Sequence, residues 1–269
     1  MTKSVPDDIL YLIIAKKAFS FNVIKQILYS KEKQPMNVLF IGAHADDIEI
    51  LFGGTLFKCR ERGDNIYMII ATNGNIGSGV INSKEEIAAI RAGEARAAAE
   101  FAGAQIMQLN FDDERLINNV ESRDALLNAI RWASPDLIFT HCPEDKSPDH
   151  HNLSQIVQDV ILSVPVKLLK TEYPPCDKKI SLFFGETTAC VGFIPEVYVD
   201  ISDYIDQKCQ MLACHKSQDE WMGNYMEDDL TELPRVMARL RGAQVDVRYA
   251  EAFRAFRIHG FMPDFKLLP

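Results

Sequence analysis

Short hydrophobic runs alternate with amphipathic stretches from residue 37 onward. Runs bounded by polar residues or glycine are typical of strands buried in a parallel sheet, and they lie at 37–42, 65–71, 105–109, 136–140 and 167–173. Apolar residues at helical spacing predict the intervening helices, at 53–62, 84–102, 121–132 and 150–162. The alanine-rich helix at 84–102 is the clearest, and Ser83 is suited to cap its N-terminus.

This alternation predicts an α/β fold, a Rossmann-like three-layer sandwich with a mostly parallel sheet and right-handed crossovers. In the strand order 3-2-1-4-5, the first and fourth strands lie side by side. The pattern weakens after Tyr173, where short strands are predicted at 181–184 and 196–201 and helices at 203–215 and 233–242. We predict a single domain, 1–269, with a helical extension at 1–35, a core at 37–173 and a C-terminal subregion at 174–269.

The N-terminal extension is predicted to form a pair of amphipathic helices. Leu10, Ile13 and Ile14 fall at helical spacing, as do Phe21, Ile24 and Leu28. Such an arm is expected to pack on the domain or on a neighbouring subunit. Its longest apolar run is too short to span a bilayer, and two aspartates precede it, so we predict neither a membrane anchor nor a secretory signal.

Polar side chains follow the first predicted strand. His44, Asp46 and Asp47 come directly after the apolar run that ends at Ile41. Ligands bind at this end of the strands in open α/β sheets. His44 and Asp47 are spaced to hold one metal ion from a single loop, which leaves Asp46 free to handle a proton. A polar loop without chemistry is the simpler interpretation of this cluster taken alone.

A second cluster, at 147–151, follows the fourth predicted strand. If the fold brings the two strand ends together, His150 completes a set of two histidines and one aspartate around a metal. Three protein ligands with an open position are typical of catalytic zinc. Asp149 is suited to orient a ligand histidine.

At these residues the chain resembles the PIG-L/LmbE-like N-deacetylases. The family signature Ala-His-Pro-Asp-Asp-x-Glu corresponds to 43–49, and its His-Pro-Asp-His motif to 147–150. Weaker matches lie at 91–96, 109–116 and 250–254. The resemblance implies hydrolysis of the acetamide of an N-acetylated amino sugar with zinc as cofactor. It assigns metal binding to His44, Asp47 and His150, the general base to Asp46, and positions near the sugar to Arg91 and Asp113.

The chain departs from this family pattern at two positions. Ala45 replaces a proline, which removes no ligand. Ser147 replaces a histidine that, in the family, helps to stabilise the oxyanion or protonate the leaving amine. His259, His151 and His141 are candidates to substitute for it. We favour His259 as a catalytic residue, because C-terminal histidines serve this purpose in the diacetylchitobiose branch.

Composition narrows the possible partners. The chain has 269 residues, 47% of them hydrophobic and 25% charged, which is ordinary for a soluble globular protein. A net charge of −9 without a basic run argues against nucleic acid or a membrane as partner. Six scattered cysteines fit reduced thiols in the cytoplasm. The expected partners are an amino-sugar substrate and, in a homo-oligomer, further copies of the chain.

Other functions remain open from the sequence. The substrate could be another amide, such as a glycopeptide or an aminoglycoside precursor of the N-acetylparomamine type. A metal- or sugar-binding protein without activity is favoured by Ser147 and disfavoured by Asp46. A dinucleotide enzyme is disfavoured because the glycine-rich loop 74–79 follows the second strand instead of the first. Trp132, Trp221 and Tyr225 are candidates either for stacking on a sugar or for the core.

Overall fold

The computed structural model describes residues 35–223 and 230–258. Met1–Pro35 and Met36–Pro269 form separate compact units. The predicted N-terminal helix pair lies outside the described residues, and the strands and helices with described positions all belong to the second unit. Within the described residues, no helix has the length and apolar character needed to cross a bilayer.

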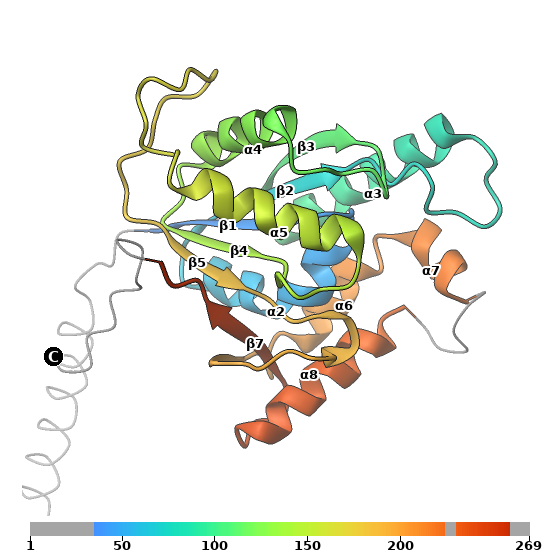
Figure 1. The fold of residues 1–269 in the computed structure, drawn as a ribbon. Coiled ribbons are helices and arrows are strands. Elements are labelled where there is room, and N and C mark those ends of the chain that lie inside the picture. The colour runs from blue at the N-terminus through green and yellow to red at the C-terminus, as the bar shows by residue number, and fades with distance from the viewer. Residues whose placement is uncertain (1–34, 224–229, 259–269) are drawn as a thin grey trace, which may run out of the picture. The chain divides into compact units, whose positions relative to one another are not determined.

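Seven strands form one sheet in the order β3-β2-β1-β4-β5-β7-β6 (Figure 1). The strands from β3 to β5 in this order pair in parallel, whereas β7 pairs antiparallel with both β5 and β6. Their bounds are β1 Asn37–Gly42, β2 Asn65–Thr72, β3 Gln105–Phe111, β4 Leu137–Thr140, β5 Ser181–Phe184, β6 Val197–Asp200 and β7 Ala250–Ala255.

Helices cover both faces of this sheet, as predicted for a three-layer sandwich. Side chains of β1 alternate between two cores, with Leu39 and Ile41 in one and Val38 and Phe40 in the other. The first core lies under α4 and α5, and the second under α2 and α3. The helices are α2 Asp47–Glu61, α3 Lys84–Ala102, α4 Val120–Ala133, α5 Pro148–Ile161, α6 Ile205–Leu212, α7 Lys216–Gly223 and α8 Glu232–Gln244, with a 3₁₀ turn at Thr188–Cys190.

The first four strands and their helices lie where the sequence predicts them, and Ser83 caps α3 by accepting the Glu86 N–H. The strand predicted at 167–173 is wrong, because Ser181–Phe184 is the strand that pairs with β4. Leu168 is 88% exposed, so this apolar stretch does not face a core. The turn before this stretch is instead held by a side chain of α4. Arg131 donates to the carbonyl oxygens of Ser163, Val164, Val166 and Leu169.

The glycine pair at the centre of α2 permits close packing. A Cβ on Gly54 would lie 2.6 Å from Ile201, so only glycine fits there. The Gly54 and Thr55 N–H groups donate to the carboxylate of Glu251 on β7, at 2.9 and 2.7 Å. Glu251 also pairs with the buried Lys208 of α6, at 2.6 Å. This carboxylate therefore ties the last strand to the helix that begins at the predicted metal loop.

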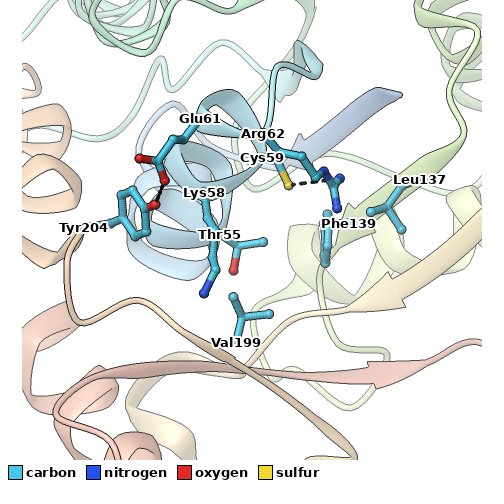
Figure 2. Close-up of a pocket in the computed structure, with 9 residues that line it drawn as sticks. All are labelled: Thr55, Lys58, Cys59, Glu61, Arg62, Leu137, Phe139, Val199 and Tyr204. Carbon is cyan, nitrogen blue, oxygen red and sulfur yellow. Dashed lines mark hydrogen bonds between the residues drawn. The ribbon is translucent and has the colours of Figure 1, made fainter. Parts of the chain in front are cut away.

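A cavity of about 600 Å³ lies beside the last two turns of α2 (Figure 2). Leu137 contributes from the first position of β4, which is the end of that strand opposite the predicted ligands. The cavity contains none of the predicted site residues. Its lining residues are Thr55, Lys58, Cys59, Glu61, Arg62, Leu137, Phe139, Val199 and Tyr204.

Candidate active site

The two predicted metal motifs meet at the carboxyl ends of β1 and β4. These strands are neighbours, with Val38 opposite Leu137. His44 lies in the loop after β1, Asp47 is the first residue of α2, and His150 is in the first turn of α5. The right-handed crossovers of a parallel sheet bring these helix starts to the same edge. The predicted juxtaposition is therefore present.

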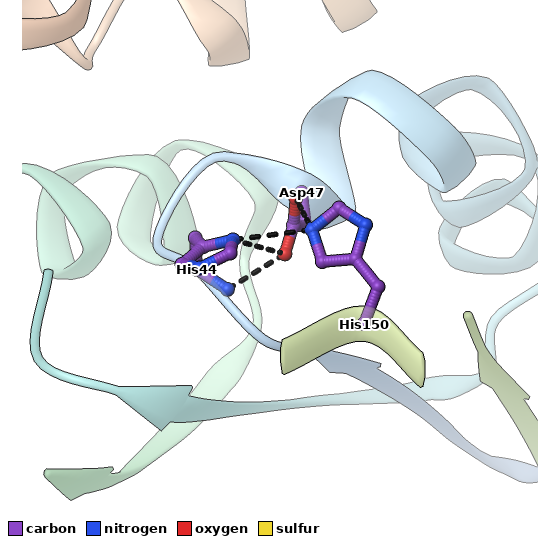
Figure 3. A group of neighbouring side chains, drawn as sticks. All are labelled: His44, Asp47 and His150. Carbon is purple, nitrogen blue, oxygen red and sulfur yellow. Dashed lines mark hydrogen bonds and ion pairs between the residues drawn. The ribbon is translucent and has the colours of Figure 1, made fainter. Parts of the chain in front are cut away.

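The three side chains converge on one point (Figure 3). His44 Nδ1 lies 3.1 Å from His150 Nε2, and the nearest Asp47 oxygens lie 3.4 Å from His44 Nδ1 and 3.2 Å from His150 Nε2. In a tetrahedral site with bonds of about 2.0–2.1 Å, ligand atoms lie about 3.3 Å apart. The geometry of these donors therefore fits a small divalent metal with at least one open position.

Carboxylates contact the outer nitrogen of each ligand imidazole. His44 Nε2 lies 3.1 Å from Asp113 and 3.4 Å from Asp149, and His150 Nδ1 lies 3.2 Å from Asp145. Such pairs fix the tautomer and the orientation of metal-binding histidines. Asp149 is itself held by the backbone N–H groups of Glu114 and Leu116. Asp149 thus lies where it can orient His44, which is one of the two predicted ligand histidines.

The charges of this cluster favour a cation. Burial lowers the pKa of His44, but Asp47, Asp113 and Asp149 outweigh that effect and hold this pKa well above its usual value. Burial raises the pKa of Asp47, yet the facing imidazoles of His150, His141 and His44 hold it well below its usual value. Around the two imidazoles lie the carboxylates of Asp47, Asp113, Asp145 and Asp149, each within 3.4 Å.

Asp46 differs from the other carboxylates because it pairs with Arg91, not with a ligand imidazole. Arg91 Nη2 donates to Asp46 Oδ1 at 3.2 Å, and Arg91 Nη1 lies 3.7 Å from Asp113. Glu94, three residues further along α3, accepts hydrogen bonds from Ser217 instead. Asp46 is therefore next to the ligands and held by a buried guanidinium.

The glycine-rich loop after β2 encloses this guanidinium. A Cβ on Gly74 would lie 2.6–2.7 Å from three atoms of Arg91, and one on Gly77 would lie 2.3 Å from Arg91 Nη1. Gly74 also has φ +65°, a conformation that favours glycine. Gln218 of α7 donates to the Gly77 carbonyl at 3.0 Å. The loop thus shapes the space around Arg91.

The structure separates the candidates for the missing histidine. Ser147 immediately precedes α5, and no hydrogen bond of its side chain caps the helix. His151 is exposed and its Nδ1 contacts the Pro143 carbonyl oxygen at 2.7 Å, so it faces a loop. His141 is fully buried behind Asp47 and cannot reach a substrate. His259 lies outside the described residues.

Sequence reasoning missed Asp145, and it weighed His141 only as a substitute acid. The need of each ligand imidazole for a carboxylate partner, together with the five-residue spacing from Asp145 to His150, is the signal for Asp145. Trp132 is a core residue, with its ring edge-on to Tyr67 at 5.2 Å. The side chains of Trp221 and Tyr225 lie outside the described residues.

Comparisons with known proteins agree with this site. Residues 39–161 match the profile of the family described as PIG-L, GlcNAc-PI de-N-acetylase. The chain is 27% identical to the diacetylchitobiose deacetylase of Thermococcus kodakarensis, covering 87% of this chain and 90% of the relative. It is 29% identical to the "Probable N-acetyl-alpha-D-glucosaminyl L-malate deacetylase 2" of Bacillus cereus, a match that covers 69% of this chain and 85% of the relative.

A solved structure of similar length has the same fold. The N,N'-diacetylchitobiose deacetylase of Pyrococcus horikoshii is 25% identical, covers 94% of this chain and 97% of its own, and superposes with a TM-score of 0.71. Fold and site together define an α/β protein whose two strand-end motifs bring together side chains that could hold a metal ion. In sequence and fold the chain is similar to deacetylases of the PIG-L type.

Proposed function

We propose that this protein is a zinc-dependent hydrolase that removes the acetyl group from an N-acetylated amino sugar. The observation that carries the proposal is the convergence of His44, Asp47 and His150, whose nearest donor atoms lie 3.1–3.4 Å apart, beside an Asp46 that pairs with Arg91. Deacetylases of amino sugars among its relatives support the substrate class.

The reaction replaces the C–N bond of an acetamide by a C–O bond to water, which releases acetate and a free amine. A bound divalent metal supplies Lewis acidity toward the water and the acetyl carbonyl. Asp46 accepts a proton from the attacking water and then returns it to the leaving nitrogen. Arg91 fixes the direction of the Asp46 carboxylate, since the guanidinium is itself enclosed by the glycine loop.

The neighbouring residues complete this proposal. Asp113 and Asp145 hold the ligand imidazoles with one nitrogen toward the metal. Arg91 and Asp113 also border the sugar in the assignment that the family resemblance implies. Ser147 cannot carry the positive charge of the usual histidine, so Asp46 handles the proton of the leaving amine, with His259 as the second donor that we propose.

Zinc is the proposed metal because two imidazoles and one carboxylate with an open position form a catalytic zinc set. The same donors accept iron, cobalt or manganese. The cysteines of the described residues are all free thiols, which supports a reducing, cytoplasmic location. A homo-oligomer remains part of the proposal through the resemblance to the family.

The test is acetate release from a panel of substrates by the zinc-loaded protein, with and without a chelator. N-acetylglucosamine, diacetylchitobiose, N-acetylparomamine and a glycopeptide cover the candidate classes. Release that the chelator abolishes and added zinc restores is the expected result. A protein that holds one zinc per chain yet cleaves none of these substrates would contradict the proposal and favour the binding protein that Ser147 suggests.

A further inference from the structure

His141 is a fully buried imidazole that the proposed reaction does not use. It follows β4 directly, and its side chain is 0% exposed. It lies behind the metal ligands, so no substrate reaches it. Its contacts nevertheless involve both motifs of the metal site.

One nitrogen of His141 contacts the ligand loop at two places. The Ala43 N–H donates to His141 Nε2 at 3.0 Å, and the same nitrogen lies 3.1 Å from Asp47 Oδ2. Ala43 immediately precedes the ligand His44, and Asp47 is the second ligand of the same loop. His141 therefore contacts both ends of the segment that supplies two of the three metal ligands.

The ring of His141 contacts the third ligand. It stacks on the imidazole of His150 with centroids 3.9 Å apart and planes 19° apart. Asp145 holds His150 at Nδ1 from another direction, at 3.2 Å. The stack thus sets the plane of the His150 ring while Asp145 sets its rotation. A single side chain after β4 thereby joins the ligand loop after β1 to the ligand on α5.

Packing alone does not account for an imidazole at this position. Among the described residues, His141 Nδ1 has no hydrogen-bond partner, and an unpaired buried polar atom costs free energy. A phenylalanine would fill a similar space and keep the stack without that cost. What an imidazole adds is the Nε2 acceptor for the Ala43 N–H, beside the Asp47 carboxylate.

We propose that His141 is a positioning residue for metal binding, which holds the loop 43–47 and the His150 ring in the geometry that the metal requires. This inference rests on the proposed function only in that the site binds a divalent metal. His141 touches neither substrate nor reacting atoms. Its loss therefore weakens metal affinity and leaves the chemical step of the loaded enzyme nearly intact.

Two substitutions separate the ring from its nitrogen. His141→Phe keeps the stack and removes Nε2, whereas His141→Gln keeps a polar atom near the Nε2 position and removes the ring. Zinc Kd is measured by competition with a chromogenic chelator, and the visible spectrum of the cobalt-substituted protein reports ligand geometry. Circular dichroism of each variant establishes that it is folded.

The Kd of His141→Phe for zinc is expected to rise by about 10–100-fold, the usual effect of losing a group that supports a metal ligand. His141→Gln is expected to recover part of this loss. The cobalt spectrum shifts in both variants. At saturating zinc, KM stays unchanged and kcat returns to within a few-fold of that of the unmodified protein.

The control is His215→Gln, which alters another fully buried imidazole whose partner, Glu49 at 3.1 Å, is no metal ligand. This control is expected to leave zinc Kd unchanged. If His141→Phe is folded and both its zinc Kd and its cobalt spectrum are unchanged, the proposal is overturned. If His141→Phe does not fold, the same result in folded His141→Gln overturns it. If the unmodified protein binds no divalent metal, the proposed function fails as well. Metal binding without deacetylation leaves this inference standing.

Discussion

Asp46 and Asp145 are both carboxylates beside the same candidate metal site, but they have different partners. Asp145 contacts the ligand His150 at 3.2 Å, whereas Asp46 pairs with Arg91 at 3.2 Å. Asp113 and Asp149 resemble Asp145 in contacting a ligand imidazole. The partner of each carboxylate therefore indicates its role. A carboxylate that contacts a ligand imidazole supports the metal site, whereas Asp46, which pairs with Arg91, is available to act on the substrate.

The largest effect is expected at the carboxylate that is itself a ligand. Asp47→Ala removes one of three donors and leaves two imidazoles facing each other at 3.1 Å. We expect stoichiometric zinc to be lost, and turnover with it, because the open site needs all three protein ligands. Metal content after gel filtration and acetate release provide the check. One zinc per chain in this variant would show that the ligand set is assigned wrongly.

Asp46→Asn tests the proposed role of Asp46 as the general base. The amide keeps the size of the side chain but cannot accept the proton, so kcat is expected to fall by about 10²–10⁴-fold. Zinc Kd should remain within a few-fold, because Asp46 is not among the ligands. Asp124→Asn, at an exposed aspartate of α4, is the matched control and should change neither value. Turnover that survives in Asp46→Asn would remove its assignment as the base.

Asp145→Asn should show the opposite pattern. Losing the carboxylate that faces His150 Nδ1 is expected to raise zinc Kd by about 10–100-fold. At saturating zinc, kcat should then approach that of the unmodified protein. Titration with zinc under steady-state conditions separates the two quantities. A fall in kcat that added zinc does not restore would place Asp145 with Asp46 and abolish the distinction.

The smallest effect is expected at the loop around Arg91. Gly77→Ala would place a Cβ 2.3 Å from Arg91 Nη1, the far end of a flexible side chain that can move. We expect a loss in kcat several-fold smaller than that of Asp46→Asn, with little change in thermal stability. Gly93→Ala on α3 is the control, since its Cβ meets only Arg96, at 3.9 Å. That control should gain up to about 1 kcal/mol of helix stability without losing activity. Equal activity in both variants would show that the position of Arg91 does not matter.

The parallel half of the sheet was predictable from the sequence because its strands are buried on both faces and read as continuous apolar runs. The run at 167–173 has the same appearance, but Leu168 is 88% exposed. Arg131 of α4 binds carbonyl groups of the turn before this run, a contact between distant residues that no local pattern reveals. Of the antiparallel edge, β6 lies within the strand predicted at 196–201, whereas β7 was not predicted as a strand.

Some residues of the candidate site were likewise predictable from the sequence and others were not. His44, Asp47 and His150 were predictable because short motifs follow two strands that the fold makes neighbours. The partner of Arg91 was not predictable. Glu94 lies one turn away on α3, and only the tertiary structure shows that Arg91 pairs with Asp46. His141 illustrates the same limit, since its position after a strand suggests an acid while its complete burial excludes contact with a substrate.

Glu251 has a consequence for the synthesis of the chain. The amide groups of Gly54 and Thr55, within the helix that begins at the ligand Asp47, have their acceptor 197 and 196 residues further along the sequence. At translation rates of about 5–20 residues per second, roughly 10–40 s pass before that acceptor has been made. During this interval α2 is a nascent helix without its carboxylate partner. A ribosome-bound chain that ends before β7 would therefore carry every metal ligand and still lack the strand that fixes α2.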